Sequence, residues 1–221
     1  MFGRKKIAML MAEFLGTGIL TLVVLAVSKS NIGIPYFIAI AAGLTIAAGT
    51  LVFGAVSGAH FNPAITLGLW SARRIQALPA LVYVAVQLLG GICAYLLYTY
   101  FVKTSWPNTA EFDSRVLVAE TVGAFVFALG WAAAVYNRLE VGKAAFVVGA
   151  SLVLGIFVAS VGSAGLLNPA VALGMRSWEL ATYVLGPVLG AVIAFNLYAL
   201  LFAPVKELLV EDKPVVAKKK K

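Results

Sequence analysis

The sequence predicts an all-α membrane protein with six transmembrane helices and two re-entrant half-helices, built as inverted three-helix repeats. Three observations carry this prediction: an apolar composition, a tripeptide that occurs twice, and a repeat that contains an odd number of spans. Of the 221 residues, 62% are hydrophobic and 12% are charged, and the mean hydropathy is +0.99. This balance is far from that of a soluble domain, so a lipid bilayer is the expected solvent.

Six apolar stretches are long enough to cross a bilayer, which takes about 20 mostly apolar residues per helix. They cover roughly residues 7–27, 34–56, 80–102, 116–136, 144–161 and 180–203. Together they fill residues 1–203 as a single membrane domain and leave a polar, basic tail at 204–221. The first stretch contains Glu13 and is too long, with the wrong flanks, for a cleavable signal peptide.

The formal net charge of +8 is placed mostly on one side of the predicted membrane domain. With the N-terminus inside, thirteen Lys and Arg residues lie on the cytoplasmic side and four on the other: Lys29, Lys103, Arg115 and Arg176. This is the positive-inside pattern, so we expect a multi-pass protein of the cell membrane with both termini in the cytoplasm. The excess charge therefore requires no nucleic-acid partner.

Cysteine and histidine each occur once, as Cys93 and His60. A disulfide framework and a metal site of the usual Cys/His kind are therefore both excluded, and no cofactor is implied. Cys93 lies in the middle of a predicted span, where its simplest role is that of a small packing residue.

The repeated tripeptide predicts the start of a short helix at two places, Asn62-Pro63-Ala64 and Asn168-Pro169-Ala170. Asn is a good N-cap because its side-chain oxygen accepts from the free N–H groups of the first turn. Pro suits the first helical position, where its φ is already right and no N–H is missed. Each triplet thus leaves an Asn amide N–H₂ group as a spare donor.

The two halves of the chain repeat one another in the same order, at about 7–102 and 116–203. Residues 12–16 are echoed by 119–123 (Ala-Glu-x-x-Gly in both), and Leu89-Gly90 by Leu189-Gly190. Because each unit has three spans, the second enters the membrane from the opposite side.

The segments that the triplets open, at 60–70 and 166–175, are too short to cross the membrane. About 10 helical residues cover some 15 Å, so two half-helices end to end would fill a hydrocarbon core of roughly 30 Å. The loops at 58–61 and 163–167 would then descend to mid-membrane, where irregular backbone is tolerated beside a water-filled cavity. We expect the carbonyl groups of Gly58, Ala59, His60 and Ala164 to line such a pore.

These features closely resemble the aquaporin family, also called major intrinsic proteins, over residues 7–203. The two triplets, with Ser57-Gly58-Ala59-His60-Phe61 before the first, are a specific signature. The resemblance implies a right-handed six-helix bundle, one pore per subunit and a homotetramer. It also implies that Glu13 and Glu120 are structural acids that hold the descending loops. A carboxylate within a span costs about 2.5 to 3.5 kcal/mol, so a proton relay is the alternative role for this pair.

The predicted function is passive conduction of water and small neutral solutes, without enzymatic activity. Each half-helix N-terminus carries about half a positive charge and repels cations, while the Asn62 and Asn168 amides donate to neutral solutes. A secondary transporter with inverted repeats is the main alternative. An intramembrane enzyme lacks its nucleophilic and acid-base groups, and a non-conducting structural member is excluded only by a flux measurement.

Four positions correspond by spacing to the outer selectivity filter of the family: Ala42, Ile156, Gly165 and Val171. The family usually has an aromatic residue at the first position and an Arg directly after the second triplet, and a glycerol facilitator usually has Asp after that Arg. Here these positions hold Ala42, Val171 and Ala172. We therefore expect a wider, more apolar filter that either admits larger neutral solutes or dewets and conducts water poorly.

Overall fold

The computed structural model describes residues 3–30, 34–107 and 111–204. Within these ranges the chain is helical without strands, and six helices are long and apolar enough to cross a membrane. They are α1 (Arg4–Lys29), α2 (Pro35–Ser57), α4 (Ala77–Val102), α5 (Ser114–Tyr136), α6 (Val141–Ala159) and the continuous helix Ala181–Leu201. The six predicted spans are confirmed, with boundaries that differ by three residues at most. The predicted basic tail, apart from Pro204, lies outside the described residues.

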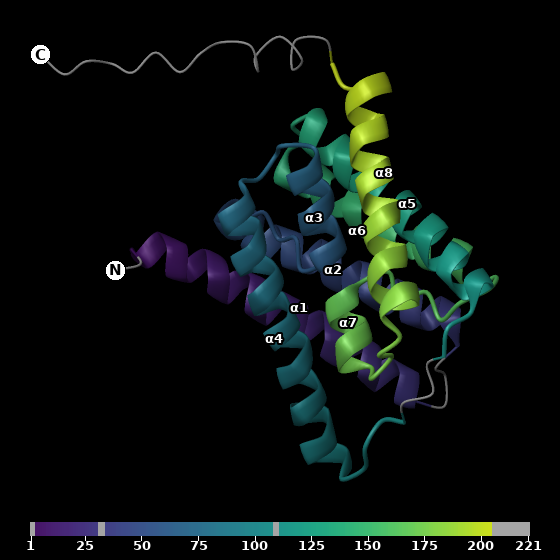
Figure 1. Ribbon diagram of the computed structural model, residues 1–221. Helices are drawn as coiled ribbons and strands as arrows, with labels where there is room; N and C mark the ends of the chain where they lie inside the picture. Colours follow the sequence, from purple (N-terminus) through teal and green to yellow (C-terminus); the bar gives the residue numbers. More distant parts are fainter. Residues whose placement is uncertain (1–2, 31–33, 108–110, 205–221) are drawn as a thin grey trace, which may run out of the picture.

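Two short helices begin at the repeated triplets, α3 (Pro63–Ser71) and α7 (Pro169–Gly174). Both begin at the proline of the triplet, as predicted, and each ends within one residue of the predicted segment. Left-handed backbone at Phe61 (φ 49°) and Leu167 (φ 50°) keeps each loop non-helical just before its triplet. After α7, left-handed Arg176 (φ 56°) prevents the helix from continuing. In Figure 1, α3 and α7 lie one above the other between α4 and α8 (Gly186–Leu201).

The helix contacts follow the predicted inverted repeat. In the first unit α1 packs on α2 and α4, and in the second α5 packs in the same way on α6 and α8. The half-helices are exchanged between the units, since α3 packs on α8 and α7 packs on α4, while α2 and α6 meet across the repeat. Each triplet is therefore held by both halves of the chain.

The sixth span is not one regular α-helix. It begins as a π-helix at Ala181–Leu185 and continues as α8. Pro187 has no N–H, and its ring would clash with the carbonyl group of Tyr183 in a regular α-helix. The wider π turn just before Pro187 removes this clash.

Glycines allow the helix backbones to approach closely, as expected for packing in a membrane. A Cβ atom added at Gly43 on α2 would lie 2.7 Å from the carbonyl oxygen of Gly149 on α6, and one at Gly149 would lie 2.7 Å from that of Gly43. Only glycine fits at either position.

The outward faces of the helices carry large apolar side chains, among them Leu44, Leu81 and Phe146. Cys93 also lies exposed on α4, beside exposed Ile92. The prediction that Cys93 is a packing residue is therefore wrong within this subunit, because its side chain points away from the helix bundle.

Candidate functional site

The asparagine side chains cap the two half-helices. Asn62 Oδ1 accepts a hydrogen bond from the N–H of Ala64 at 2.8 Å, and Asn168 Oδ1 accepts from that of Ala170 at 3.0 Å. Both asparagines are buried, with exposed fractions of 1% and 3%. Each side-chain oxygen is thus occupied, and the amide N–H₂ group is directed elsewhere.

The asparagine amides also cross-link the two repeats. Asn62 Nδ2 donates to the carbonyl oxygen of Leu167 at 2.9 Å, and Asn168 Nδ2 donates to that of Phe61 at 2.9 Å. An N–H₂ group has two hydrogens, so each amide retains one for another acceptor. The sequence analysis missed these two bonds, although the presence of irregular loops directly before both triplets was a signal for them.

Glu13, on α1, contacts the loop that leads to the first triplet. Its carboxylate accepts from Ser57 Oγ at 2.6 Å, from the N–H of His60 at 3.0 Å and from the N–H of Phe61 at 2.8 Å. Gln87 Nε2 on α4 donates to the same carboxylate at 2.8 Å. Four donors therefore compensate the burial of this acid.

Glu120, on α5, makes the matching contacts in the second repeat. Its carboxylate accepts from the N–H groups of Leu166 and Leu167 at 2.9 and 2.7 Å, and also from Ser163 Oγ. The bonds from Ser163, Leu166 and Leu167 occupy the same places relative to the triplet as those that Glu13 receives. Both acids are fully buried.

Gln87 is a part of the site that the sequence analysis missed. Besides Glu13, its amide donates to Thr66 Oγ1 on α3 at 2.9 Å, and His60 Nδ1 lies 3.2 Å from the same hydroxyl. The available signal was an amide residue in the middle of an apolar span. In the second repeat the equivalent position holds Pro187, so this network exists on one side only.

The residue before the first triplet fills a gap between two helices. A Cβ atom added at Gly16 on α1 would lie 2.1 Å from the Phe61 ring, and one at Gly49 on α2 would lie 2.5 Å from it. The ring is therefore packed directly on these two glycines. This contact gives a physical reason for the glycine of the Ala-Glu-x-x-Gly motif.

Leu167 occupies the equivalent gap in the second repeat. Cβ atoms at Gly123 on α5 and Gly155 on α6 would lie 2.8 and 3.1 Å from its side chain. Gly123 ends the second Ala-Glu-x-x-Gly motif. Each motif thus supplies one acid that binds a loop and one glycine that makes room for the side chain of that loop.

We expect Gly16→Val to destabilise the protein because the new side chain would overlap the Phe61 ring. Overpacking of this kind costs about 1–3 kcal/mol, so the unfolding midpoint in detergent should fall clearly. Gly142→Val is the matched control, since nothing lies within 4 Å of a Cβ atom at that position. Equal midpoints for the two variants would contradict the tight packing of Phe61.

A cavity with a volume of ≈ 20 Å³ lies between the two repeats at the asparagines. We call it the narrow cavity. Its volume is enough for about one water molecule. Both asparagines and all four predicted filter positions line it; the lining residues are Leu20, Val24, Ile38, Ala42, Ile46, Asn62, Phe127, Leu152, Ile156, Gly165, Leu166, Asn168 and Val171. Of these thirteen described residues, the two asparagines alone have polar side chains.

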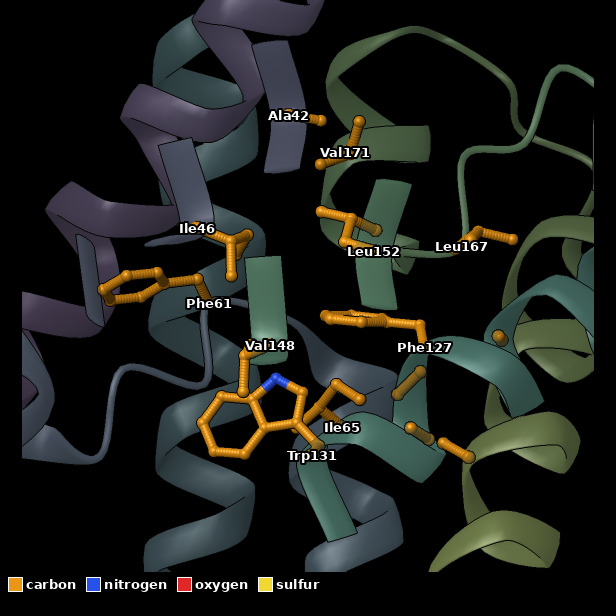
Figure 2. Packing of buried hydrophobic residues seen from close by; sticks show 14 of the residues in the cluster. Ala42, Ile46, Phe61, Ile65, Phe127, Trp131, Val148, Leu152, Leu167 and Val171 are labelled. Carbon is orange, nitrogen blue, oxygen red and sulfur yellow. The ribbon is translucent and has the colours of Figure 1, made fainter. Parts of the chain in front are cut away.

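The predicted filter end of this cavity is apolar. Figure 2 shows the side chains of Ala42 and Val171 pointing toward one another. Gly165 lies against Ile156, because a Cβ atom added there would be 3.1 Å from its side chain. Arg176 is not among the lining residues; its Nη1 donates to Tyr95 Oη at 3.2 Å. The branched aliphatic side chains of Ile46 and Leu152 also line the narrow cavity.

A second cavity of ≈ 440 Å³, hereafter the vestibule, opens beyond the narrow cavity. It is lined by Gly58 and His60 of the first loop and by Trp131, with Thr50 and Arg74 among its other polar side chains. Ala59, also predicted to line a pore, is fully buried, and Ala164 is exposed near the other end of the site. Among the described residues no three His, Cys, Asp or Glu side chains come together to hold a metal ion.

Comparison with known proteins agrees with this geometry. The sequence profile of the family described as "Major intrinsic protein" matches residues 3–198. The chain is 30% identical to Aquaporin Z of Photorhabdus laumondii, over 88% of this chain and 97% of that protein. It is 35% identical to human Aquaporin-5, over 87% of this chain and 80% of that protein.

Two further similarities are to proteins whose names refer to glycerol. The chain is 31% identical to a protein named "Glycerol uptake facilitator protein-like 6" of Lactiplantibacillus plantarum, over 83% of this chain and 93% of that protein. The crystal structure of the aquaglyceroporin from Plasmodium falciparum superposes with a TM-score of 0.76, at 22% identity, and covers 92% of this chain and 99% of that one. At this identity the superposition shows a shared fold.

Proposed function

The chain belongs to the major intrinsic protein family and is a passive channel for water and small solutes, and we propose that its solutes pass the Asn62 and Asn168 amides in single file. The observation that carries this proposal is the narrow cavity, where two polar side chains stand in an otherwise apolar wall. Each amide has one N–H bound to a loop carbonyl and one N–H free to donate. A water or neutral solute oxygen is a suitable acceptor.

Ion exclusion at this point follows from the capped half-helices. The N-termini of α3 and α7 each bring about half a positive charge to the asparagines. A cation there meets two positive helix ends and two amide N–H groups, and apolar walls replace none of its hydration shell. Neutral molecules with acceptor oxygens pass, whereas cations are repelled and the passage of protons is reduced.

The proposed filter is formed by Ala42, Ile156, Gly165 and Val171, which lack the fixed cationic donor and the aromatic ring of the usual family pattern. Its wall consists of uncharged aliphatic groups, and Ile156 and Val171 are the members whose side chains can change rotamer. Such side chains can swing aside for a solute larger than water. We propose that the channel accepts small polyols and urea as well as water.

Glu13 and Glu120 are proposed to hold the two descending loops in the conformation that presents the asparagines. Their carboxylates bind loop N–H groups in equivalent positions of both repeats. A proton relay would require a partner for each acid along one path, whereas these carboxylates are occupied by backbone donors. The family assignment also disfavours an ion-coupled transporter. Among the described residues that line the narrow cavity, none besides the asparagines has a polar side chain that could support an enzymatic role.

The subunit is a multi-pass membrane protein, and we propose that it forms a homotetramer in the cell membrane with both termini in the cytoplasm. The exposed apolar faces of the helices are compatible with lipid and with neighbouring subunits. In this orientation the vestibule faces the cytoplasm. Crosslinking of the detergent-purified protein should then give bands up to a tetramer.

Cysteine labelling tests the orientation. In a Cys93→Ala background, Ser105→Cys between the repeats is expected to react with an impermeant maleimide from outside the cell. Lys143→Cys, at the start of α6, should react only after the membrane is permeabilised. Both positions are exposed on the described chain. Labelling of the two from the same face would contradict the inverted repeat.

Stopped-flow light scattering of proteoliposomes tests the function. Vesicles containing the protein should shrink faster than protein-free vesicles in an impermeant osmolyte, with a low temperature dependence. Glycerol and urea gradients should then give shrinkage followed by re-swelling as the solute enters. A saturable flux that depends on an ion gradient would instead favour a transporter.

A further inference from the structure

Trp131 on α5 carries a buried donor that has no hydrogen-bonding partner in the described part of the chain. Its side chain is 5% exposed, and Nε1 has no hydrogen-bond partner among the described residues. A buried indole N–H usually has a partner, and its absence is costly. The ring also lines the vestibule. These facts together suggest that the partner is a molecule in the cavity.

The ring of Trp131 is held in place by His60. The two rings meet edge to face with centroids 5.7 Å apart, and His60 also packs edge to face on Tyr83 at 5.3 Å. Because His60 Nδ1 lies 3.2 Å from Thr66 Oγ1, the histidine is itself fixed to α3. Trp131 is therefore positioned by the same loop that carries the first triplet.

Trp131 stands where the narrow cavity leads toward the vestibule. Phe127, four residues earlier and so on the same face of α5, lines the narrow cavity. In Figure 2 the side chains of Val171, Leu152, Phe127 and Trp131 follow one another in this order and form a column. In this view the indole nitrogen is on the ring edge nearer to Val148 and Ile65.

We propose that Trp131 is a specificity-determining residue whose indole N–H donates a hydrogen bond to each permeating molecule at the inner end of the column. This inference rests on the proposed function, because it requires solute to pass the asparagines. Figure 2 labels Phe127, Val148 and Ile65 near Trp131, and all three side chains are apolar. Trp131 and the neighbouring His60 then bring polar groups to the vestibule.

The chemistry of this donor defines its ligands. An indole N–H is a donor only, so it binds water, hydroxyl groups and the urea carbonyl oxygen. Ammonium and metal cations offer no acceptor and face the positive end of the N–H bond. The bulk of the indole also limits the width of the passage. Trp131 thus combines a size limit with selection for acceptors, at the end of the pore opposite to the apolar filter.

Trp131→Phe and Trp131→Ala separate these two properties. Phenylalanine keeps an aromatic ring against His60 but removes the N–H, so water permeability per channel should fall by about two- to tenfold, the factor that corresponds to one typical hydrogen bond. Alanine removes the bulk as well, so solutes larger than those accepted by the wild type should enter. Trp70→Phe, on an exposed tryptophan of α3, is the matched control.

The measurement is stopped-flow flux in proteoliposomes at equal protein content, with size-exclusion profiles to confirm that each variant is folded. Wild-type flux in Trp131→Phe together with a wild-type size limit in Trp131→Ala would overturn the inference. If Asn62→Leu abolishes flux in the same series, the pore remains at the asparagines and only the role of Trp131 fails. If the wild type itself shows no flux above protein-free vesicles, the proposed function fails instead.

Discussion

Asn62→Leu and Asn168→Leu are each expected to reduce flux per inserted channel by about tenfold or more. Each substitution removes a helix cap worth about 1 kcal/mol. It also leaves a buried carbonyl, that of Leu167 or Phe61, without its donor, at a cost of about 1–3 kcal/mol. Each substitution also removes one of the two polar side chains in the described lining of the narrow cavity.

The measurement is water flux in proteoliposomes at matched protein content. Asn137→Leu is the control: this exposed asparagine at the end of α5 bonds Tyr198 Oη at 2.9 Å, away from the narrow cavity. Its flux should equal that of the wild type. Unchanged flux in both triplet variants would mean that the pore lies elsewhere in the subunit.

The two asparagines are also expected to be coupled. Each bonds the carbonyl group directly before the other triplet, so loss of one bond loosens the loop that presents the second asparagine. The double variant should therefore lose less unfolding free energy than the sum of the two single losses. This coupling is a consequence of the crossed bonds and would be absent if each asparagine acted only as a cap.

The spans and half-helices could be predicted because their signals are local. Apolar length defines a membrane helix, and the Asn-Pro pair defines the start of α3 and of α7. The π turn before Pro187 could not be located in the same way. A proline near the start of an apolar stretch is compatible with a regular first turn, and only the continuation of the helix N-terminal to Pro187 forces the backbone to widen.

The contacts around the triplets were harder to predict because they join distant parts of the chain. Spacing identified Asn62, Asn168 and the glutamates as candidates, yet the bonds from each asparagine to the other loop depend on how the repeats meet. Gln87 and Trp131 belong to no repeated motif. Their only signals were a polar group in an apolar span and an aromatic donor at mid-helix, both of which are equally typical of ordinary packing.

Val171→Arg is expected to convert the proposed broad channel into a more restrictive one. Val171 faces Ala42 across the narrow cavity and is 2% exposed, so a long side chain there must lie along the passage. A guanidinium group can bind carbonyl oxygens of the loop at 162–167 and would be held there, unlike the aliphatic side chains that now form the wall. Arg176 cannot supply this group, because it is bound to Tyr95 outside the narrow cavity.

Two separate effects should follow from this substitution. Glycerol and urea flux should fall to near the level of protein-free vesicles because the passage narrows, while water still passes. Proton leak should also fall, because the wild type relies on the two half-helix ends, at about half a charge each, and the variant adds a full charge. Val171→Met separates the two effects, since it narrows the passage without a charge and should lower glycerol flux but leave proton leak unchanged.

The decisive comparison is between the wild type and these two variants in glycerol, urea and proton flux. The wild type should pass glycerol and urea at a measurable rate, and some protons. Rejection of both solutes by a wild type that conducts water would show that Ala42, Ile156, Gly165 and Val171 restrict solutes by size as strongly as a filter with an arginine. In that case the aliphatic side chains around the narrow cavity do not swing aside, and its volume of ≈ 20 Å³ is itself the size limit.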